Sequence, residues 1–358
     1  MLRALLSFVV LPDRVLTVWC TFMKLGFVVA PLTRLELRER VRTWHELVQY
    51  SPDSVEDGHS QLAELTEALH LRTVLSELPA RVNALMIVPD DVLHGMPFAA
   101  LQHDGSHLIE RFAMSIGFSM RALDGGRAEG GSGGLVVAVS RGSEQLPPIP
   151  QAKIEAQEIA AWMSSRGVNV TFLLDDDANH QAVLDALSRA SVAHIACHGI
   201  FEPDRPDASG IMLASMLGSD ERLTLRDLSV AQLGNCGHIT LSSCWSADNF
   251  ILPSRWIISL PETLWRRGVE SVLGSLWQVD DVVARAFMAR FYGALERLPR
   301  DAALREAQLA CLTNKLNCSA EGDLEPIDTS SPFYWSGFNL YGSPDRLHLP
   351  AKCKACNQ

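Results

Sequence analysis

The stretch Ser191-Val-Ala-His-Ile-Ala-Cys-His-Gly199 is a short apolar run that ends on a histidine and a glycine. A second run, Gly237-His-Ile-Thr-Leu-Ser-Ser-Cys244, ends on a cysteine in the same way. Apolar runs of this length, separated by helical patterns, are typical of buried parallel strands. If both are strands of one α/β sheet, His198 and Cys244 lie at its carboxyl edge, where open α/β sheets place their chemistry.

The segments on either side of these two runs support a sheet of this kind. From residue 134 onward, strand-like and helix-like segments alternate, which predicts a mostly parallel sheet with helices on both faces. The other strands are expected at 135–140, 168–174 and 269–279, and helices at 151–166, 178–190, 223–233, 261–267, 280–298 and 301–314. Ser336–Tyr341 is expected to be a late edge strand.

The N-terminal part has a different organisation. Residues 1–80 predict a β-hairpin or meander followed by helices, an accessory region of the whole unit. Residues 81–133 form a β-rich segment, in which Leu108–Ser119 alternates like a hairpin, and it ends in the glycine-rich stretch 124–134, expected to be a linker. The catalytic unit is then expected at 134–345, and a C-terminal tail at 346–358, where Cys353 and Cys356 have the spacing of half a zinc site but are interpreted as a solvated tail.

The composition excludes several classes of protein. The chain has 358 residues, 47% of them apolar, and a net charge of −11, which argues against direct binding of nucleic acid. Its eight cysteines are too few for a disulfide framework in a chain this long, and they favour a reducing compartment. No apolar run is long enough to span a bilayer, so we expect a cytoplasmic protein without a membrane partner. No nucleotide motif or defensible metal-ligand set is found, so no cofactor and no metal are expected.

Cysteine and histidine at one sheet edge predict nucleophilic chemistry. A thiol becomes a good nucleophile when an imidazole within hydrogen-bond reach removes its proton. His198 is therefore expected to be the general base and Cys244 the nucleophile. The backbone N–H groups of Gly199 and Cys244 are expected to stabilise the oxyanion that forms on the attacked carbonyl.

Several ordered motifs resemble one family. Leu85-Met-Ile-Val-Pro-Asp-Asp-Val-Leu-His-Gly-Met-Pro-Phe-Ala-Ala-Leu101, the histidine and cysteine motifs, Gly268-Val-Glu-Ser-Val-Leu-Gly-Ser-Leu-Trp-Gln-Val-Asp-Asp281 and Trp335-Ser-Gly-Phe-Asn-Leu-Tyr-Gly342 are similar to the CHAT family, caspase-like peptidases akin to separases. The histidine precedes the cysteine by 46 residues here, and by roughly 50 in caspases. The resemblance implies a caspase-like fold and a cysteine endopeptidase with a His198–Cys244 dyad. Such an enzyme would act on a protein or peptide substrate under the control of an activating protein partner.

Two features bear on the substrate. Asp280 and Asp281 follow the Ser275-Leu-Trp-Gln-Val segment and, by resemblance to separases, would bind a basic residue before the scissile bond. The alternative is that an aspartate here caps the next helix. Trp245 stands where the family usually has a small polar turn, so it is expected to shape the substrate pocket, and it also motivates a rival interpretation of the chain as a catalytically silent binding scaffold.

Overall fold

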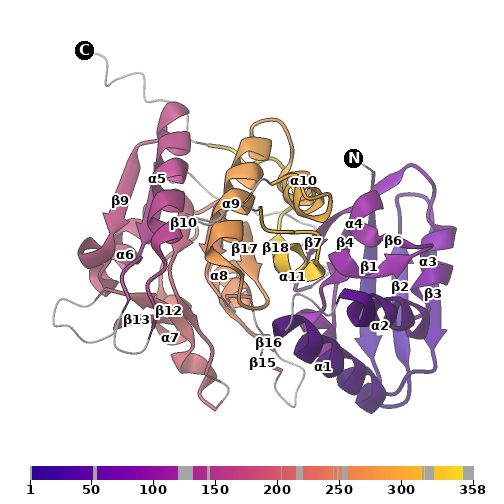
Figure 1. The fold of residues 1–358 in the computed structure, drawn as a ribbon. Coiled ribbons are helices and arrows are strands. Elements are labelled where there is room, and N and C mark those ends of the chain that lie inside the picture. The colour runs from indigo at the N-terminus through magenta and orange to yellow at the C-terminus, as the bar shows by residue number, and fades with distance from the viewer. Residues whose placement is uncertain are drawn as a thin grey trace.

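A sheet of eleven strands runs through the molecule from one end to the other (Figure 1). Its order is β3-β2-β1-β4-β7-β18-β17-β14-β10-β8-β9, and most neighbouring strands are parallel. The computed structural model describes residues 2–50, 55–119, 132–142, 146–202, 204–214, 221–244, 246–247, 250–251, 257–316, 318 and 326–349. The predicted fold class, a mostly parallel α/β sheet with an N-terminal meander, is confirmed.

The strands of this sheet fall into an N-terminal and a C-terminal half. The N-terminal half holds β1 (Leu2–Val10), β2 (Val15–Cys20), β3 (Leu25–Ala30), β4 (Val82–Val88) and β7 (Ala113–Ile116). The C-terminal half holds β8 (Gly133–Ala138), β9 (Val170–Leu174), β10 (Ala190–Ala196), β14 (His238–Ser242), β17 (Ser271–Ser275) and β18 (Phe338–Gly342). All seven residues of β10 are buried, as expected for a strand covered on both faces.

Helices cover both faces of the C-terminal half. One layer contains α5 (Pro150–Ser165), α9 (Asp281–Leu295) and α10 (Arg300–Leu312), and the other contains α6 (His180–Leu187), α7 (Leu225–Val230) and α8 (Leu260–Arg266). In the N-terminal half, α1 (Arg34–Tyr50), α2 (Val55–Ala68) and α3 (Leu71–Glu77) lie together beside the first strands. The short helices α4 (Leu108–Arg111) and α11 (Pro332–Trp335) complete the helical part, and β11 (Gly199–Ile200), β12 (Gly210–Leu213) and β13 (Glu221–Thr224) form a small separate sheet.

Three predicted elements differ from the structure. Ser336–Tyr341 does not form an edge strand, because β18 lies in the middle of the sheet, antiparallel to β17 and parallel to β7. Leu108–Ser119 is not a hairpin: α4 replaces its first half, and β7 pairs in parallel with β4. The segment 223–233 is not one helix, because Thr224 ends β13 and caps α7, accepting a hydrogen bond from the Asp227 N–H.

Two of the sequence predictions fall wholly or partly on residues that the structure does not describe. The predicted linker 124–134 lies outside the described residues up to 131, and Gly133 and Gly134 begin β8. The Cys353–Cys356 pair also lies outside them. Within the part of the chain that the structure describes, every helix is too short or too polar to cross a bilayer.

Candidate active site

The register of two central strands brings His198 and Cys244 to one place. β10 and β14 are parallel, and Ala196 pairs with Ser242. His198 and Cys244 each follow these paired residues by two positions, so they leave the sheet at the same edge. Gly199 lies directly against the cysteine: a Cβ built on it would be 2.0 Å from the Cys244 carbonyl oxygen. Only a glycine permits this approach of the two chains.

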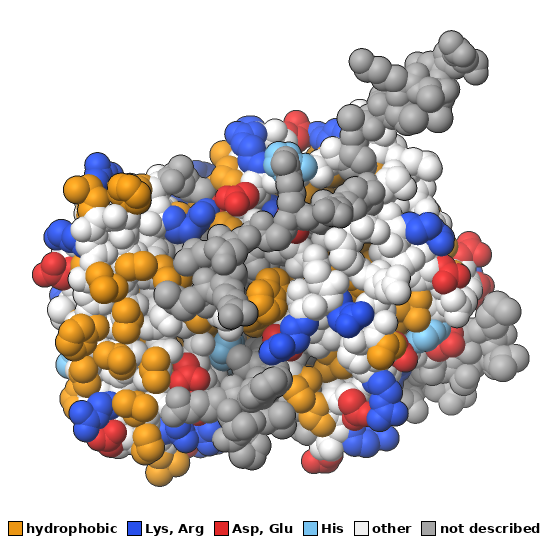
Figure 2. Space-filling model, turned by 180° about the vertical axis from the view of Figure 1, so that it is seen from behind, with side chains coloured by type: hydrophobic (Ala, Val, Ile, Leu, Met, Phe, Trp, Pro, Cys, Tyr) orange, Lys and Arg blue, Asp and Glu red, His pale blue; other side chains and the backbone are white. Residues whose placement is uncertain are grey.

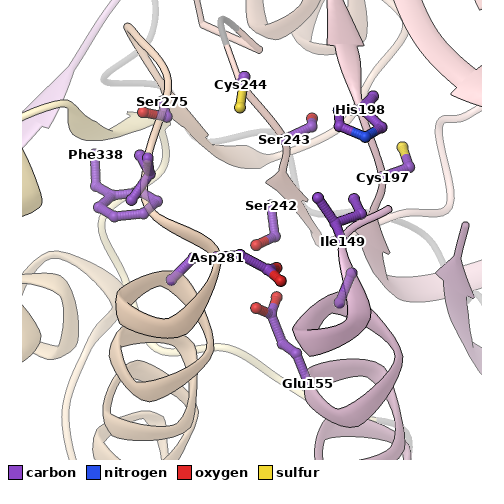
Figure 3. Close-up of a pocket in the computed structure, with 13 residues that line it drawn as sticks. Ile149, Glu155, Cys197, His198, Ser242, Ser243, Cys244, Ser275, Asp281 and Phe338 are labelled. Atoms are coloured by element: carbon purple, nitrogen blue, oxygen red, sulfur yellow. The ribbon is translucent and has the colours of Figure 1, made fainter. Parts of the chain in front are cut away.

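Both side chains line one pocket at the carboxyl edge of the sheet (Figure 3). The pocket lies between the first turns of α5 and α9 and the ends of β10, β14 and β17, and its polar lining includes Ser242, Ser243, Ser275, Glu155 and Asp281. The cavity is narrow, about 50 Å³, and partly open to solvent. Because about 10–15 Å³ of such volume is enough for one water molecule, the cavity holds a few waters, and a longer ligand would extend through its mouth.

The imidazole of His198 is oriented by the backbone. Its Nε2 lies 2.8 Å from the Pro147 carbonyl oxygen. A carbonyl oxygen can only accept a hydrogen bond, so Nε2 carries the proton in the neutral ring and Nδ1 has the free lone pair. The ring is therefore held in the tautomer that can take a proton through Nδ1.

Cys244 is a protonated thiol in this arrangement. Burial is the main cause that raises the pKa of the Cys244 thiol, and the nearby carboxylate of Asp281 raises it further. A hydrogen bond with the backbone of Val279 acts in the opposite direction, but the net pKa shift is upward. Any nucleophilic reaction of this thiol would therefore need a base to take its proton, because burial disfavours the thiolate at rest.

We expect the Cys244 thiol to react with iodoacetamide more slowly at pH 7 than a free cysteine does, and its rate to rise only at alkaline pH. The Asp281→Asn variant should shift this profile to lower pH, because removing the negative charge lowers the pKa of the thiol. The measurement is the pH–rate profile of alkylation at Cys244, followed by peptide mass spectrometry. Reaction at pH 7 faster than glutathione would contradict the protonated resting state.

Asp280 and Asp281 take separate places. The carboxylate of Asp280 accepts hydrogen bonds from the N–H groups of Val282 and Val283, both 3.0 Å away, and so caps α9. The carboxylate of Asp281 lines the pocket and accepts a hydrogen bond from the Gln151 N–H at 2.9 Å. Burial is the main cause that raises the pKa of Asp281; the hydrogen bond from Gln151 lowers it, and the Glu155 carboxylate raises it.

Glu155 is a pocket residue that the sequence analysis missed. It lies on α5 with 2% of its surface exposed, and its carboxylate points toward that of Asp281 (Figure 3). Its Oε1 is 2.8 Å from Nε2 of His194, whose Nδ1 is 3.2 Å from the Tyr292 hydroxyl. The sequence contains a signal for it: a carboxylate on the buried face of α5, between Ala152 and Ile159, is out of place unless it faces a polar site.

The remaining predicted residue, Trp245, lies outside the described residues. The next two residues of the chain are hydrogen-bonded to the end of β17. The Ser246 hydroxyl accepts a hydrogen bond from the Ser275 N–H at 3.0 Å, and the Ala247 N–H donates to the Ser275 carbonyl oxygen at 2.8 Å. Within the described ranges, His, Cys, Asp and Glu side chains do not gather into a group of three that could hold a metal ion.

Solved structures with the same arrangement of strands and helices identify the class of fold. The chain superposes on separase in a Saccharomyces cerevisiae separase–securin complex with a TM-score of 0.61 and 10% identity, over 96% of this chain and 30% of that one. It superposes on the Arg-specific cysteine proteinase gingipain R with a TM-score of 0.54 and 12% identity, over 87% of this chain and 76% of that one. The fold is that of caspase-like cysteine peptidases.

The sequence itself identifies the family. The profile of the CHAT domain matches residues 59–343, so the chain belongs to the CHAT family. It is also 23% identical over 322 residues to tetratricopeptide repeat protein 28 of Homo sapiens, and 24% identical over 324 residues to the Mus musculus protein. The match covers 76% of this chain but only 12% of each of those proteins.

Proposed function

We propose that the chain is a cysteine endopeptidase that hydrolyses peptide bonds with Cys244 as nucleophile and His198 as base. The observation that carries the proposal is the close approach of the two strand ends, where Gly199 lies against the Cys244 backbone and both side chains line one pocket. In this proposal residues 134–345 form the catalytic unit, and the N-terminal strands and helices form an accessory half.

The reaction would begin with transfer of the Cys244 proton to Nδ1 of His198. The sulfur attacks the peptide carbonyl, and the developing oxyanion is stabilised by the backbone N–H groups of Gly199 and Cys244. The C–N bond then breaks as His198 returns the proton to the leaving amine, which leaves a thioester on the sulfur. Water, deprotonated by His198, hydrolyses the thioester and regenerates the thiol.

The test is an experiment with a proteome-derived peptide library. The protein is incubated with the library, and new termini are identified by mass spectrometry beside a Cys244→Ala sample. Cuts that appear only with the unchanged protein support the peptidase. If no cuts form, and an acyloxymethyl ketone that ends in arginine also fails to label Cys244, the proposal is overturned.

We infer that the residue before the scissile bond is basic, with Asp281 as its partner. The proposal rests on the half-buried carboxylate of Asp281 and the buried carboxylate of Glu155, which face each other within the pocket. A guanidinium or ammonium group would relieve their mutual repulsion and form charge-assisted hydrogen bonds. The cavity is only about 50 Å³ but partly open, so a basic side chain would reach the two carboxylates through the mouth of the pocket. An activating protein partner that widens the pocket is part of this proposal.

We expect Asp281→Asn to lower kcat/KM about 10- to 100-fold for peptides with arginine before the cut, the loss of one charged hydrogen bond. The pKa of Asp281 is raised, so the carboxylate becomes protonated at higher pH than an ordinary aspartate does. Cleavage after arginine should therefore decline as the pH falls through that raised pKa, and the decline should shift in the variant. Asp185→Asn, an exposed position on α6, is the control. Equal kcat/KM values in the two variants would exclude Asp281 as the specificity residue.

A binding scaffold is the second candidate function. The observations that favour it are the narrow cavity and the raised pKa of the Cys244 thiol. A scaffold would retain its protein partner when Cys244 is replaced by alanine and would release no new termini in the partner's presence. Partner-dependent cleavage that disappears in Cys244→Ala would exclude it.

A further inference from the structure

The outermost strand at the N-terminal end of the sheet has an open edge. β3 is the last strand in the order, and none of the described residues pairs with its outer side. Its sequence, Leu-Gly-Phe-Val-Val-Ala, contains neither a charged residue nor a proline. Natural proteins usually use such residues to prevent an edge strand from pairing with another chain. Its register with β2 is unbroken from Cys20↔Leu25 to Val15↔Ala30. The edge strand therefore has no bulge, and its outer side is able to pair.

A buried tryptophan supports the geometry of this edge. The ring of Trp19 lies over Gly26, where a Cβ would be 2.5 Å from the nearest ring atom. An aromatic ring that covers a glycine on an edge strand stabilises the extended backbone there. Gly26 and Val28 are half-buried on this covered face, and the intervening residues of β3 point to the other face.

The uncovered face of β3 is apolar. Leu25, Phe27 and Val29 are 76%, 69% and 41% exposed, and Phe22 and Met23 in the preceding turn are 96% and 73% exposed. Figure 2 shows hydrophobic side chains gathered over this half of the sheet. At the opposite end of the sheet, β9 has one exposed residue, Thr171. An exposed apolar row of this kind marks an interaction surface.

The chemistry of the edge fits a second copy of the same chain. In an antiparallel pair of two β3 strands centred on Phe27, residue numbers in opposite positions add up to 54. Phe27 then faces the second copy's Phe27, and Leu25 faces the second copy's Val29. Lys24, the sole charged residue in 15–31, faces an alanine. This segment has no carboxylate of its own, and the nearby Glu77 is paired with Lys24 at 4.0 Å. Although the chain has a net charge of −11, two copies would therefore bring few unpaired negative charges together at this edge.

We propose that β3 pairs antiparallel with β3 of a second copy, so that two eleven-stranded sheets join across a two-fold axis through Phe27. The interface is isologous, with the same patch on both copies. Backbone hydrogen bonds and the cross-strand apolar pairs hold it together. The inference does not depend on peptidase chemistry, because the open edge lies at the end of the sheet that is remote in strand order from β10 and β14.

Sedimentation velocity over a range of protein concentrations tests the proposal. The unchanged protein is expected to show a monomer–dimer equilibrium. Phe27→Lys should weaken it at least tenfold, since two like charges would then face each other across the axis. Leu35→Lys is the matched control, because Leu35 is 78% exposed on α1 and the substitution adds the same charge. A protein that stays monomeric throughout, or a dimer weakened equally by both substitutions, would overturn the proposal.

Cross-linking tests the register and does not require the lysine variant to fold. In a Cys20→Ser background, Phe27→Cys should form a disulfide between two copies when copper-phenanthroline and oxygen oxidise the two thiols. Leu25→Cys alone should not, because two such residues lie four positions apart, about 13 Å. A mixture of Leu25→Cys and Val29→Cys should cross-link. Self-linking of Leu25→Cys as efficient as that of Phe27→Cys would overturn the pairing.

Discussion

Replacing Cys244 with alanine is expected to abolish peptide hydrolysis and to leave the protein folded. The substitution removes the sulfur that forms the thioester in the proposed mechanism, while the lost side chain is small and half-buried. His198→Ala should have an effect of similar size, because burial keeps the thiol protonated unless a base acts. In each case kcat should fall on the order of 10³-fold or more. The nucleophile and its base act as one unit, so removing either one costs about as much as removing both.

The measurement is the steady-state hydrolysis of a peptide identified in the library experiment, with far-UV circular dichroism and thermal unfolding of each variant. Cys20→Ala is the control, because Cys20 is also half-buried and lies in the N-terminal half of the sheet. Turnover that persists in Cys244→Ala would assign the nucleophile elsewhere. Full turnover in His198→Ala would remove the histidine from the mechanism.

Gly199→Ala is expected to be strongly damaging although it adds a single methyl group. The new Cβ would lie 2.0 Å from the Cys244 carbonyl oxygen, and backbone atoms cannot rotate away as a side chain does. The two strand ends must separate, which should lower the free energy of unfolding by about 3 kcal/mol and displace the nucleophile from its base. Activity should fall by about 100-fold, the loss expected from an ångström of misplacement.

Gly293→Ala provides the control for this substitution. Gly293 is exposed on α9, and a Cβ there meets no atom within 4 Å. Alanine is a better helix former than glycine, so this variant should be stabilised by about 0.5–1 kcal/mol with unchanged activity. The two unfolding curves can be compared directly. Equal stability of the two variants would mean that the approach of Gly199 to Cys244 is not a constraint on the fold.

The sequence predicts the parts of the molecule that local patterns determine. The largely apolar run of β10 and the alternation of strands and helices after residue 134 are sufficient for the sheet class and for the adjacency of His198 and Cys244. The helical periodicity of residues 59–78 is continuous, but the structure divides this stretch between α2 and α3, because His70 adopts a left-handed conformation with φ of 54° and separates them. A single residue whose backbone dihedral angles lie outside the α-helical region of φ/ψ space ends a helix without altering the spacing of its apolar residues.

Local sequence patterns do not predict features that depend on contacts between distant parts of the chain. The central position of β18 depends on partners more than sixty residues away in β17 and more than two hundred in β7, and a short apolar strand looks the same at an edge or in the middle. Glu155 belongs to the pocket because α5 is placed beside α9, where the two carboxylates meet. Adjacent aspartates also look equivalent in sequence. In the structure α9 begins at Asp281, so Asp280 caps the helix and Asp281 lines the pocket.

The placement of β18 has a consequence for how the protein is made. β7 and β17 are joined only through this strand, and its residues 338–342 follow every other strand of the sheet in the chain. During synthesis both halves therefore emerge with an open inner edge, and they remain two separate sheets until the ribosome has released β18. Insertion of one strand between them is a long-range step, slow relative to the local pairing of β1 with β2. Chaperone binding and premature aggregation should both act on the nascent chain in that interval, when the edges of β7 and β17 are still unpaired.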